Sequence, residues 1–319
     1  MRCAPLTPLT LPAALAGLLL LTACGSQTAD ARGDGPARTR VSGSPADACG
    51  ARPSLTMATP DAPEASGDGE VRITDMGDKV RGCTRFEVTN RQSEPFTFTI
   101  IFTFLGESGG ALENVERTVA SVGPGKTVRR TVIWPALHPD AGSAQVRVLQ
   151  VRSVPAAEAP SSKGPCPRSG VRVYADDGDA AMGLRVVGLH LENCGTGVVH
   201  LNGYPRLQLL DEDHKPVEGV AILRGGASIA SGTGADGTPE AVDVEPGERA
   251  HATLVWRNTV TGFDGAVNAP YVRVWANTGA APVTVVPELD LGTTGKLGVG
   301  PWKKDEDSEA GAPGRTGTP

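Results

Sequence analysis

The chain has 319 residues and a formal net charge of −6, and it contains 41 glycines and 26 prolines. Because glycine and proline disfavour helix interiors, this composition excludes a helical bundle or a coiled coil. A mildly acidic chain without a basic block is a poor candidate for nucleic-acid binding. The length predicts two domains, since a single hydrophobic core seldom grows to this size.

The first residues predict export. An apolar stretch from Leu9 to Leu21 is too short for a permanent membrane helix, which needs about 20 apolar residues. It ends in Leu21-Thr22-Ala23-Cys24, which resembles the lipobox of bacterial lipoprotein precursors. The resemblance implies that residues 1–23 are a signal peptide and that Cys24 carries the diacylglyceryl and palmitate-type lipid. We then expect a lipoprotein on the extracytoplasmic face of the cell membrane; the alternative is an ordinary secretory signal with a chance cysteine.

The cysteines that remain are Cys49, Cys83, Cys166 and Cys194. An even number in an oxidising compartment predicts disulfides, and several pairings are possible. We expect the neighbour pairing, Cys49 with Cys83 and Cys166 with Cys194, because it keeps each disulfide inside one block of the chain. The absence of a CxxC motif from the sequence argues against a thioredoxin-like redox site or a zinc ribbon.

Composition divides the rest of the chain. Residues 24–48, rich in Gly, Ala, Ser, Pro and charge, predict a flexible tether. Residues 154–165 predict a linker and residues 303–319 a disordered tail. The two blocks that remain, 49–153 and 166–302, are the expected domains.

Both blocks show the two-residue alternation that is typical of half-buried strands. From Phe96 to Phe104, aromatic and isoleucine side chains alternate with threonines. No amphipathic helix of three turns is found, and turn residues recur about every 8–12 positions. The pattern predicts an all-β protein made of tandem immunoglobulin-like antiparallel β-sandwich domains. The same alternation occurs in residues 145–154, 184–191, 206–210, 250–256 and 271–276.

The two blocks also resemble each other. Residues 122–134 and 244–256 share the pattern V-x-P-G-x5-T-aliphatic-aliphatic-W, and residues 86–90 resemble 189–193. Pro-Gly predicts a turn and the run after it a strand. We infer one sandwich unit present twice, with the tryptophan of each copy used in packing.

A further set of motifs marks the second block: Cys166-Pro167, Asn193-Cys194-Gly195, Leu201-Asn-Gly-Tyr204-Pro205, Pro246-Gly247, Leu254-Val-Trp256-Arg257-Asn258 and the run LGTTGKLGVGPW from Leu291 to Trp302. Together they resemble the domain-of-unknown-function 4232 family over residues 166–302. The resemblance implies a secreted or lipid-anchored actinobacterial protein, and it implies no established activity.

Two short sequence patterns resemble catalytic or nucleotide-binding motifs, but their surroundings favour ordinary turns. Ser108 lies in a G-x-S-x-G pattern, but every histidine follows it in the sequence, whereas trypsin-like proteases need one before the serine. The α/β-hydrolase order needs a helix after the serine, and no helical pattern follows. The stretch from Ala120 to Thr127 lacks the first glycine of a Walker A loop. We therefore predict that the protein is not an enzyme.

Two acidic loops, 176–179 and 211–213, contain oxygen ligands that calcium accepts, but EF-hand spacing is missing and Asp-Gly is typical of a turn. The histidines show no H-x-x-x-H spacing. We expect no metal ion and no cofactor, and calcium in the acidic loops stays an open alternative.

Loop residues of the second block are the candidate binding residues, because sandwich loops often carry recognition. We predict a non-enzymatic binding or adaptor module of the cell envelope, attached to the membrane by its lipid. Its partner would be a cell-wall polymer or another exported protein. The alternatives are a small-molecule or metal-binding lipoprotein serving a transporter, and a secreted hydrolase. The candidates combine stacking surface with hydrogen-bond donors: Tyr204, Arg257, Asn258, Lys296 and Trp302.

Overall fold

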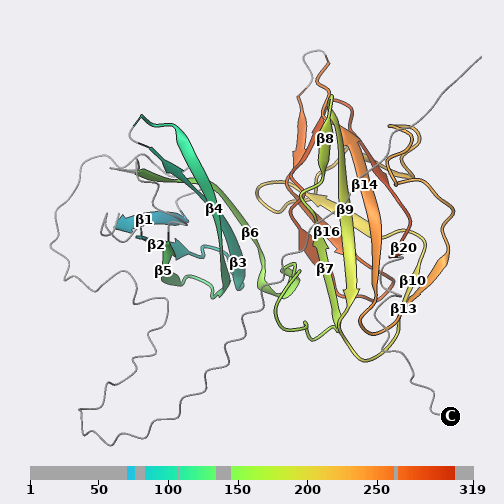
Figure 1. The fold of residues 1–319 in the computed structure, drawn as a ribbon, viewed down its shortest axis with the longest axis horizontal. Helices are drawn as coiled ribbons and strands as arrows, with labels where there is room; N and C mark the ends of the chain where they lie inside the picture. The colour runs from blue at the N-terminus through green and yellow to red at the C-terminus, as the bar shows by residue number, and fades with distance from the viewer. Residues whose placement is uncertain (1–69, 76–82, 107, 134–144, 262–264, 306–319) are drawn as a thin grey trace, which may run out of the picture. The chain divides into compact units, whose positions relative to one another are not determined.

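The computed structural model describes residues 70–75, 83–106, 108–133, 145–261 and 265–305. This part of the chain consists of β-strands joined by turns, plus one short 3-10 helix, η2 (Ala156–Glu158) (Figure 1). The predicted all-β class built on antiparallel sheets is confirmed. Cys24 and the predicted signal peptide and tether lie outside the described residues.

The first sandwich contains two three-stranded antiparallel sheets, with strand orders β1-β2-β5 and β4-β3-β6. Its core forms where the two sheets face each other. Successive side chains of β3 point to opposite faces of its sheet, and this places Phe98, Ile100 and Phe102 on the core side, where each is fully buried. The strands are β1 (Val71–Asp75), β2 (Cys83–Thr89), β3 (Phe96–Leu105), β4 (Ala111–Val122), β5 (Thr127–Ile133) and β6 (Gln145–Pro155).

The second sandwich has a larger sheet of order β12-β19-β14-β9-β7, with β20 beside β14 and β8 beside β9. Smaller antiparallel sheets are β11-β16-β17, β10-β13 and β15-β18. Only β12 and β19, among the strand pairs that the structure describes, run parallel. The strands are β7 (Val171–Ala175), β8 (Asp179–Ala181), β9 (Leu184–Asn193), β10 (Val199–Asn202), β11 (Arg206–Leu210), β12 (Ala221–Arg224), β13 (Ala241–Val244), β14 (Arg249–Arg257), β15 (Val267–Ala269), β16 (Tyr271–Trp275), β17 (Val283–Val285), β18 (Leu289–Gly292), β19 (Lys296–Val299) and β20 (Lys303–Lys304).

The predicted internal repeat has a structural counterpart. In the first sandwich β2 pairs with β1 and β5, and in the second β9 pairs with β7 and β14, all antiparallel. Phe96 of β3 pairs with Val122 of β4, and Val199 of β10 pairs with Val244 of β13 in the same way. The two sandwiches therefore share their central strand order. Trp256 of the second copy is buried, as expected, whereas Trp134 lies outside the described residues.

Part of the segment expected as a linker is structured. Val154 and Pro155 end β6, and η2 follows. Glu158 accepts hydrogen bonds from Arg273 Nε at 2.8 Å and from Thr284 Oγ1 at 2.6 Å. These bonds fix η2 to the β11-β16-β17 sheet. Beyond the expected domain boundary, β20 pairs with the start of β14.

Candidate functional site

A depression of about 560 Å³ lies at the ends of strands in the second sandwich. We call it the rim site and define it by its lining residues. Asn202 ends β10, Arg206 begins β11 and Trp275 ends β16, so three strands meet there. The lining is His200, Asn202, Tyr204, Arg206, Trp275, Asn277, Thr278 and Gly279.

The backbone between β10 and β11 presents Tyr204 to the rim site. Gly203 has φ +71°, a left-handed conformation that glycine adopts without strain and that turns the chain sharply after β10. The Gly203 carbonyl accepts a hydrogen bond from Trp302 N at 2.8 Å, and Pro205 is buried behind the turn. Leu201 points into the core while its neighbours His200 and Asn202 are exposed, as strand alternation requires.

Two arginine side chains lie over aromatic rings that line this site, Arg206 within the lining and Arg224 beside it. Arg206 and Trp275 are paired across β11 and β16, and the Arg206 Cζ atom lies 3.8 Å from the centre of the Trp275 indole. Arg224, the last residue of β12, lies over the Tyr204 ring at 5.6 Å. Stacking of a guanidinium on an aromatic face holds it in one orientation and leaves its N–H edge available.

Hydrogen bonds fix the other side of the rim site. His200 Nδ1 bonds Asp243 Oδ1 at 2.6 Å across the β10–β13 pair. Asn277 Nδ2 donates to the His200 carbonyl at 3.0 Å, which ties the turn after β16 to β10. The backbone around the depression is therefore held in place, which favours a preorganised site.

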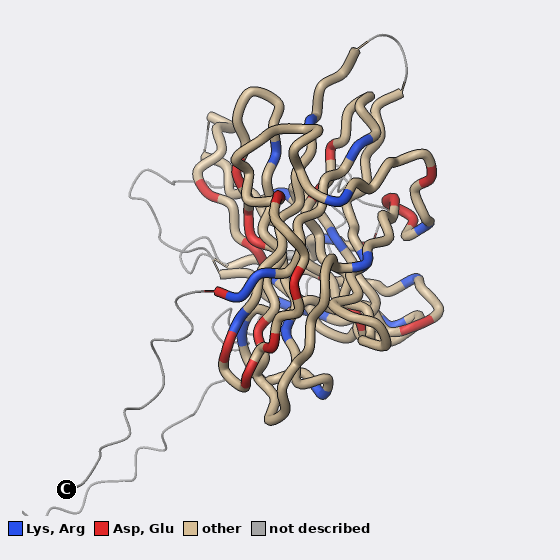
Figure 2. Tube along the Cα trace, turned by 90° about the vertical axis from the view of Figure 1, so that its right-hand side faces the viewer, with Lys and Arg blue, Asp and Glu red and all other residues tan. Residues whose placement is uncertain are grey.

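The rim site lacks negative charge among its lining residues, although the whole chain carries a net charge of −6. Figure 2 shows lysine and arginine positions interspersed with acidic positions along the chain trace. A depression lined by aromatic, amide, hydroxyl and guanidinium groups can stack on a ligand and donate hydrogen bonds to its oxygen atoms.

Of the five predicted binding residues, Tyr204 is the one that lines the rim site. Arg257, Asn258 and Lys296 lie together at the opposite end of β14. Arg257 donates weakly to the Ile229 carbonyl at 3.4 Å, and Lys296, at the start of β19, is exposed. Trp302 is 1 % exposed, and its indole Nε1 donates to the Ala276 carbonyl at 2.9 Å. Its environment is that of a core residue.

The half-exposed Asp290 side chain binds both Asn258 and Trp256, which are two residues apart in the sequence. Trp256 Nε1 donates to Asp290 Oδ1 at 2.7 Å, and Asn258 Nδ2 donates to Asp290 Oδ2 at 2.8 Å. Arg185 adds an ion pair to the same carboxylate at 3.1 Å. These bonds tie β18 to β9 and to the end of β14, so Asn258 has a structural contact here.

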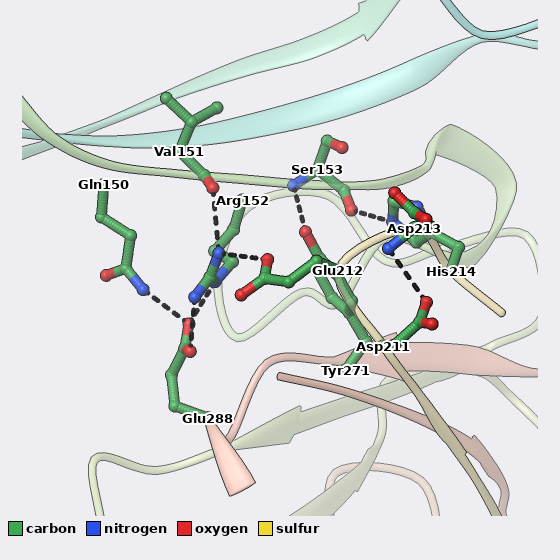
Figure 3. A network of polar contacts seen from close by, with 10 residues as sticks. All are labelled: Gln150, Val151, Arg152, Ser153, Asp211, Glu212, Asp213, His214, Tyr271 and Glu288. Atoms are coloured by element: carbon green, nitrogen blue, oxygen red, sulfur yellow. Dashed lines mark hydrogen bonds and ion pairs between the residues drawn. The ribbon is translucent and has the colours of Figure 1, made fainter. Parts of the chain in front are cut away.

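A second polar network surrounds Arg152 of β6 (Figure 3). Arg152 makes two hydrogen bonds with Glu288, at 2.5 and 2.7 Å, and one with Glu212 at 2.8 Å. Burial opposes the charge on Arg152, but hydrogen bonding to Glu288 and the charges of both glutamates outweigh it and raise its pKa. The depression beside the network, about 930 Å³, therefore has its main cation already neutralised.

Tyr271 and His214 complete this network (Figure 3). The Tyr271 hydroxyl accepts a hydrogen bond from Ser153 N at 3.2 Å, and His214 Nε2 donates to the Ser153 carbonyl at 2.6 Å. The two rings stack with centres 4.4 Å apart, and Phe96 packs edge-on against His214. Burial raises the pKa of Tyr271.

Most of the residues that the sequence offered as catalytic or metal-binding candidates lie in turns and stabilise them. The Asp176 carboxylate accepts from Gly178 N and Gly188 N and contacts His190 Nε2 at 2.9 Å. The Asp211 carboxylate accepts hydrogen bonds from the backbone N–H groups of Asp213 and Lys215 in the same turn. Ser108 is exposed in the turn between β3 and β4. Over the ranges that the structure describes, no group of three His, Cys, Asp or Glu side chains is placed to hold a metal ion.

Cys166 and Cys194 form a disulfide with a Cα–Cα distance of 5.7 Å, as expected. Cys83 is also disulfide-bonded, and Cys49, the partner expected for it, lies outside the described residues. None of the helices in the described ranges has the length and apolar character needed to cross a membrane.

Residues 166–303 match the model of the domain of unknown function DUF4232. This DUF4232 segment contains the second sandwich, the disulfide and the rim site, so the resemblance seen in the sequence is confirmed there. No curated protein matches the chain.

Sequence reasoning missed Arg206, Arg224 and Trp275. Each lies at the end of a short strand, and each is separated from its aromatic or cationic neighbour by many residues. The nearest available signal was the Tyr204-Pro205-Arg206 run in the motif before β11, which places an aromatic residue and a cation directly after a glycine turn.

Proposed function

We propose that the chain is a lipid-anchored, non-enzymatic binding module of the cell envelope whose DUF4232 domain carries the binding surface at the rim site. One observation supports this choice most strongly. The rim site gathers aromatic rings, amides and Arg206 at strand ends, and Arg224 lies beside it over the Tyr204 ring. The described structure uses neither guanidinium in a hydrogen bond or ion pair. Binding sites are typically concave surfaces with a few such convergent polar groups.

The proposed arrangement is simple. Cys24 would hold the chain at the extracytoplasmic face of the membrane, and residues 24–48 would act as a tether with a coil span of about 25–30 Å. The disulfide-closed domain would then reach a cell-wall polymer or another exported protein. Recognition would use groups already held by the surrounding hydrogen bonds, which lowers the ordering cost of binding.

Cross-linking in intact cells tests the binding role. Full-length chain and a Tyr204→Ser variant are expressed, cross-linked and recovered under denaturing conditions. We expect the wild type to retain an envelope component and Tyr204→Ser to lose most of it. Tyr174→Ser, which changes a half-buried tyrosine of the same domain away from the rim site, is the matched control. Recovery of no envelope component by the wild type contradicts the proposed function.

Metabolic labelling tests the anchor. Cells that express the wild type should incorporate palmitate into the protein, and the Cys24→Ala variant should not. Cys3→Ala is the matched control, because Cys3 lies inside the predicted signal peptide and should leave labelling unchanged. Equal labelling of wild type and Cys24→Ala would refute lipid attachment at this residue.

A further inference from the structure

Arg206 and Arg224 differ from the arginines that form close ion pairs. Arg152 and Arg172 each contact a glutamate at 2.7–2.8 Å, and Arg273 contacts Glu158 at 2.8 Å. Within the described ranges, Arg206 and Arg224 have an aromatic ring as their neighbour and no carboxylate. Their charges are therefore available to a ligand.

The Arg206 guanidinium suits a planar anion. At 3.8 Å from the centre of the Trp275 ring, it loses water from the stacked face, and this strengthens any hydrogen bond that its edge makes. Guanidinium groups bind carboxylate and phosphate oxygens through two parallel N–H···O bonds. The Asp243 carboxylate, which contacts the lining residue His200, is already bonded to it and does not line the site.

The remaining lining groups suit a polyhydroxyl compound. Tyr204 offers an aromatic surface to the apolar face of a sugar ring, while Asn202 and Thr278 are exposed and can exchange hydrogen bonds with hydroxyl groups. A volume of about 560 Å³ is within the range for ligand sites, and its exposed walls allow a chain to extend beyond it.

We infer that the rim site binds an anionic envelope glycan or polyol polymer, with Arg206 and Arg224 contacting its carboxylate or phosphate groups and Tyr204 stacking on its sugar or polyol backbone. This inference rests on the proposed binding function and names the ligand class for the same site. A guanidinium recognises carboxylate and phosphate in the same way. The experiment therefore uses a separate probe for each of the two anionic groups.

Calorimetric titration of the detergent-solubilised full chain tests the inference. The probes are an oligouronate for carboxylate, a poly(glycerol phosphate) for phosphate and a neutral dextran as control. We expect one or both anionic probes to bind and dextran not to bind. The affinity for the anionic probes should fall as salt is raised from 50 to 200 mM, because added ions screen the attraction between opposite charges.

Substitutions locate the binding groups. Arg206→Ala and Arg224→Ala should each weaken binding by about tenfold or more, the usual effect of losing a charge-assisted contact. Arg206→Lys should recover only part of the affinity, since an ammonium keeps the charge but not the stacked planar fork. Arg147→Ala, an exposed strand arginine of the first sandwich, removes the same charge elsewhere and should leave binding unchanged.

The outcomes are separable. If the wild type captures an envelope component in cells but binds neither anionic probe, the ligand class is wrong and the proposed function stands. Equal binding of dextran, or wild-type affinity in Arg206→Ala and Arg224→Ala, also overturns the inference. Circular dichroism melting curves of each variant ensure that a loss of binding is not a loss of folding.

Discussion

Asn90 and Asn193 make the same side-chain bonds in the two sandwiches. Asn90 Nδ2 donates to the carbonyls of Glu94 and Val122 at 2.7 and 2.8 Å, and Asn193 Nδ2 donates to those of Gly197 and Val244 at 2.8 and 2.7 Å. Both asparagines are almost completely buried. In each sandwich one carboxamide therefore joins the end of a central strand to the opposite sheet.

Asn193→Ala should destabilise the second sandwich by about 2–3 kcal/mol, because two buried carbonyls lose their donor. Hydrogen exchange measured by mass spectrometry should show faster exchange in β9 and β14. Asn90→Ala should have the same effect on β2 and β5 and should leave β9 and β14 protected. Uniformly faster exchange in both sandwiches of either variant would contradict this separation.

Asp290→Ala should cost about 2–3 kcal/mol, because the buried Trp256 N–H and the Asn258 amide lose their acceptor. Asp290→Asn should cost less, since one acceptor oxygen remains. Thermal unfolding followed by tryptophan fluorescence measures both. As a control, Asp243→Ala removes an exposed partner of His200 and should change stability by less than about 1 kcal/mol.

We expect burial of the Tyr271 hydroxyl to make the folded chain less stable at alkaline pH. Burial raises the pKa of its hydroxyl in the folded chain, so the unfolded chain releases this proton first. The contribution of the Tyr271 hydroxyl to folding stability is complete below the ordinary tyrosine pKa of about 10. It is lost as the pH rises through the pKa of this hydroxyl in the folded chain. Tyr271→Phe should flatten the fall in unfolding midpoint above about pH 10. An unchanged alkaline slope in this variant would contradict the assignment.

The Cys166–Cys194 disulfide closes a loop with a sequence separation of 28. Replacing both cysteines with serine should destabilise the second sandwich by about 3–4 kcal/mol through the greater freedom of the unfolded chain. Urea unfolding of the double variant measures this, and peptide mapping without reductant confirms the link in the wild type. An unchanged midpoint would show that the bond does not restrict the unfolded state.

The strands were predictable where one face is apolar and the other is not. The run from Phe96 to Phe104 is an example, because the apolar side chains at every second position are buried and threonines occupy most of the positions between them. The Pro-Gly turns before β5 and β14 were predictable for a similar local reason. Both the alternation and the turn chemistry are contained in adjacent residues.

The rim site was not predictable in this way. Arg206 and Trp275 become neighbours through the pairing of β11 with β16, and a single sequence does not specify which strands pair. Trp302 shows the opposite problem, since it follows a Gly-Pro pair typical of a loop and yet is buried in the core. Its indole N–H finds a carbonyl on the segment after β16, a partner that only the folded sheet supplies.

The disulfide also has a mechanical consequence. Residues 167–193, which contain β7, β8 and β9, lie inside the loop that the Cys166–Cys194 bond closes. A pulling force applied to the chain ahead of residue 166 passes through the sulfur bridge to residue 194, and the loop itself carries no tension. These strands cannot be extended until the bond is reduced, so a domain tethered from its N-terminal side keeps that part of its largest sheet under load.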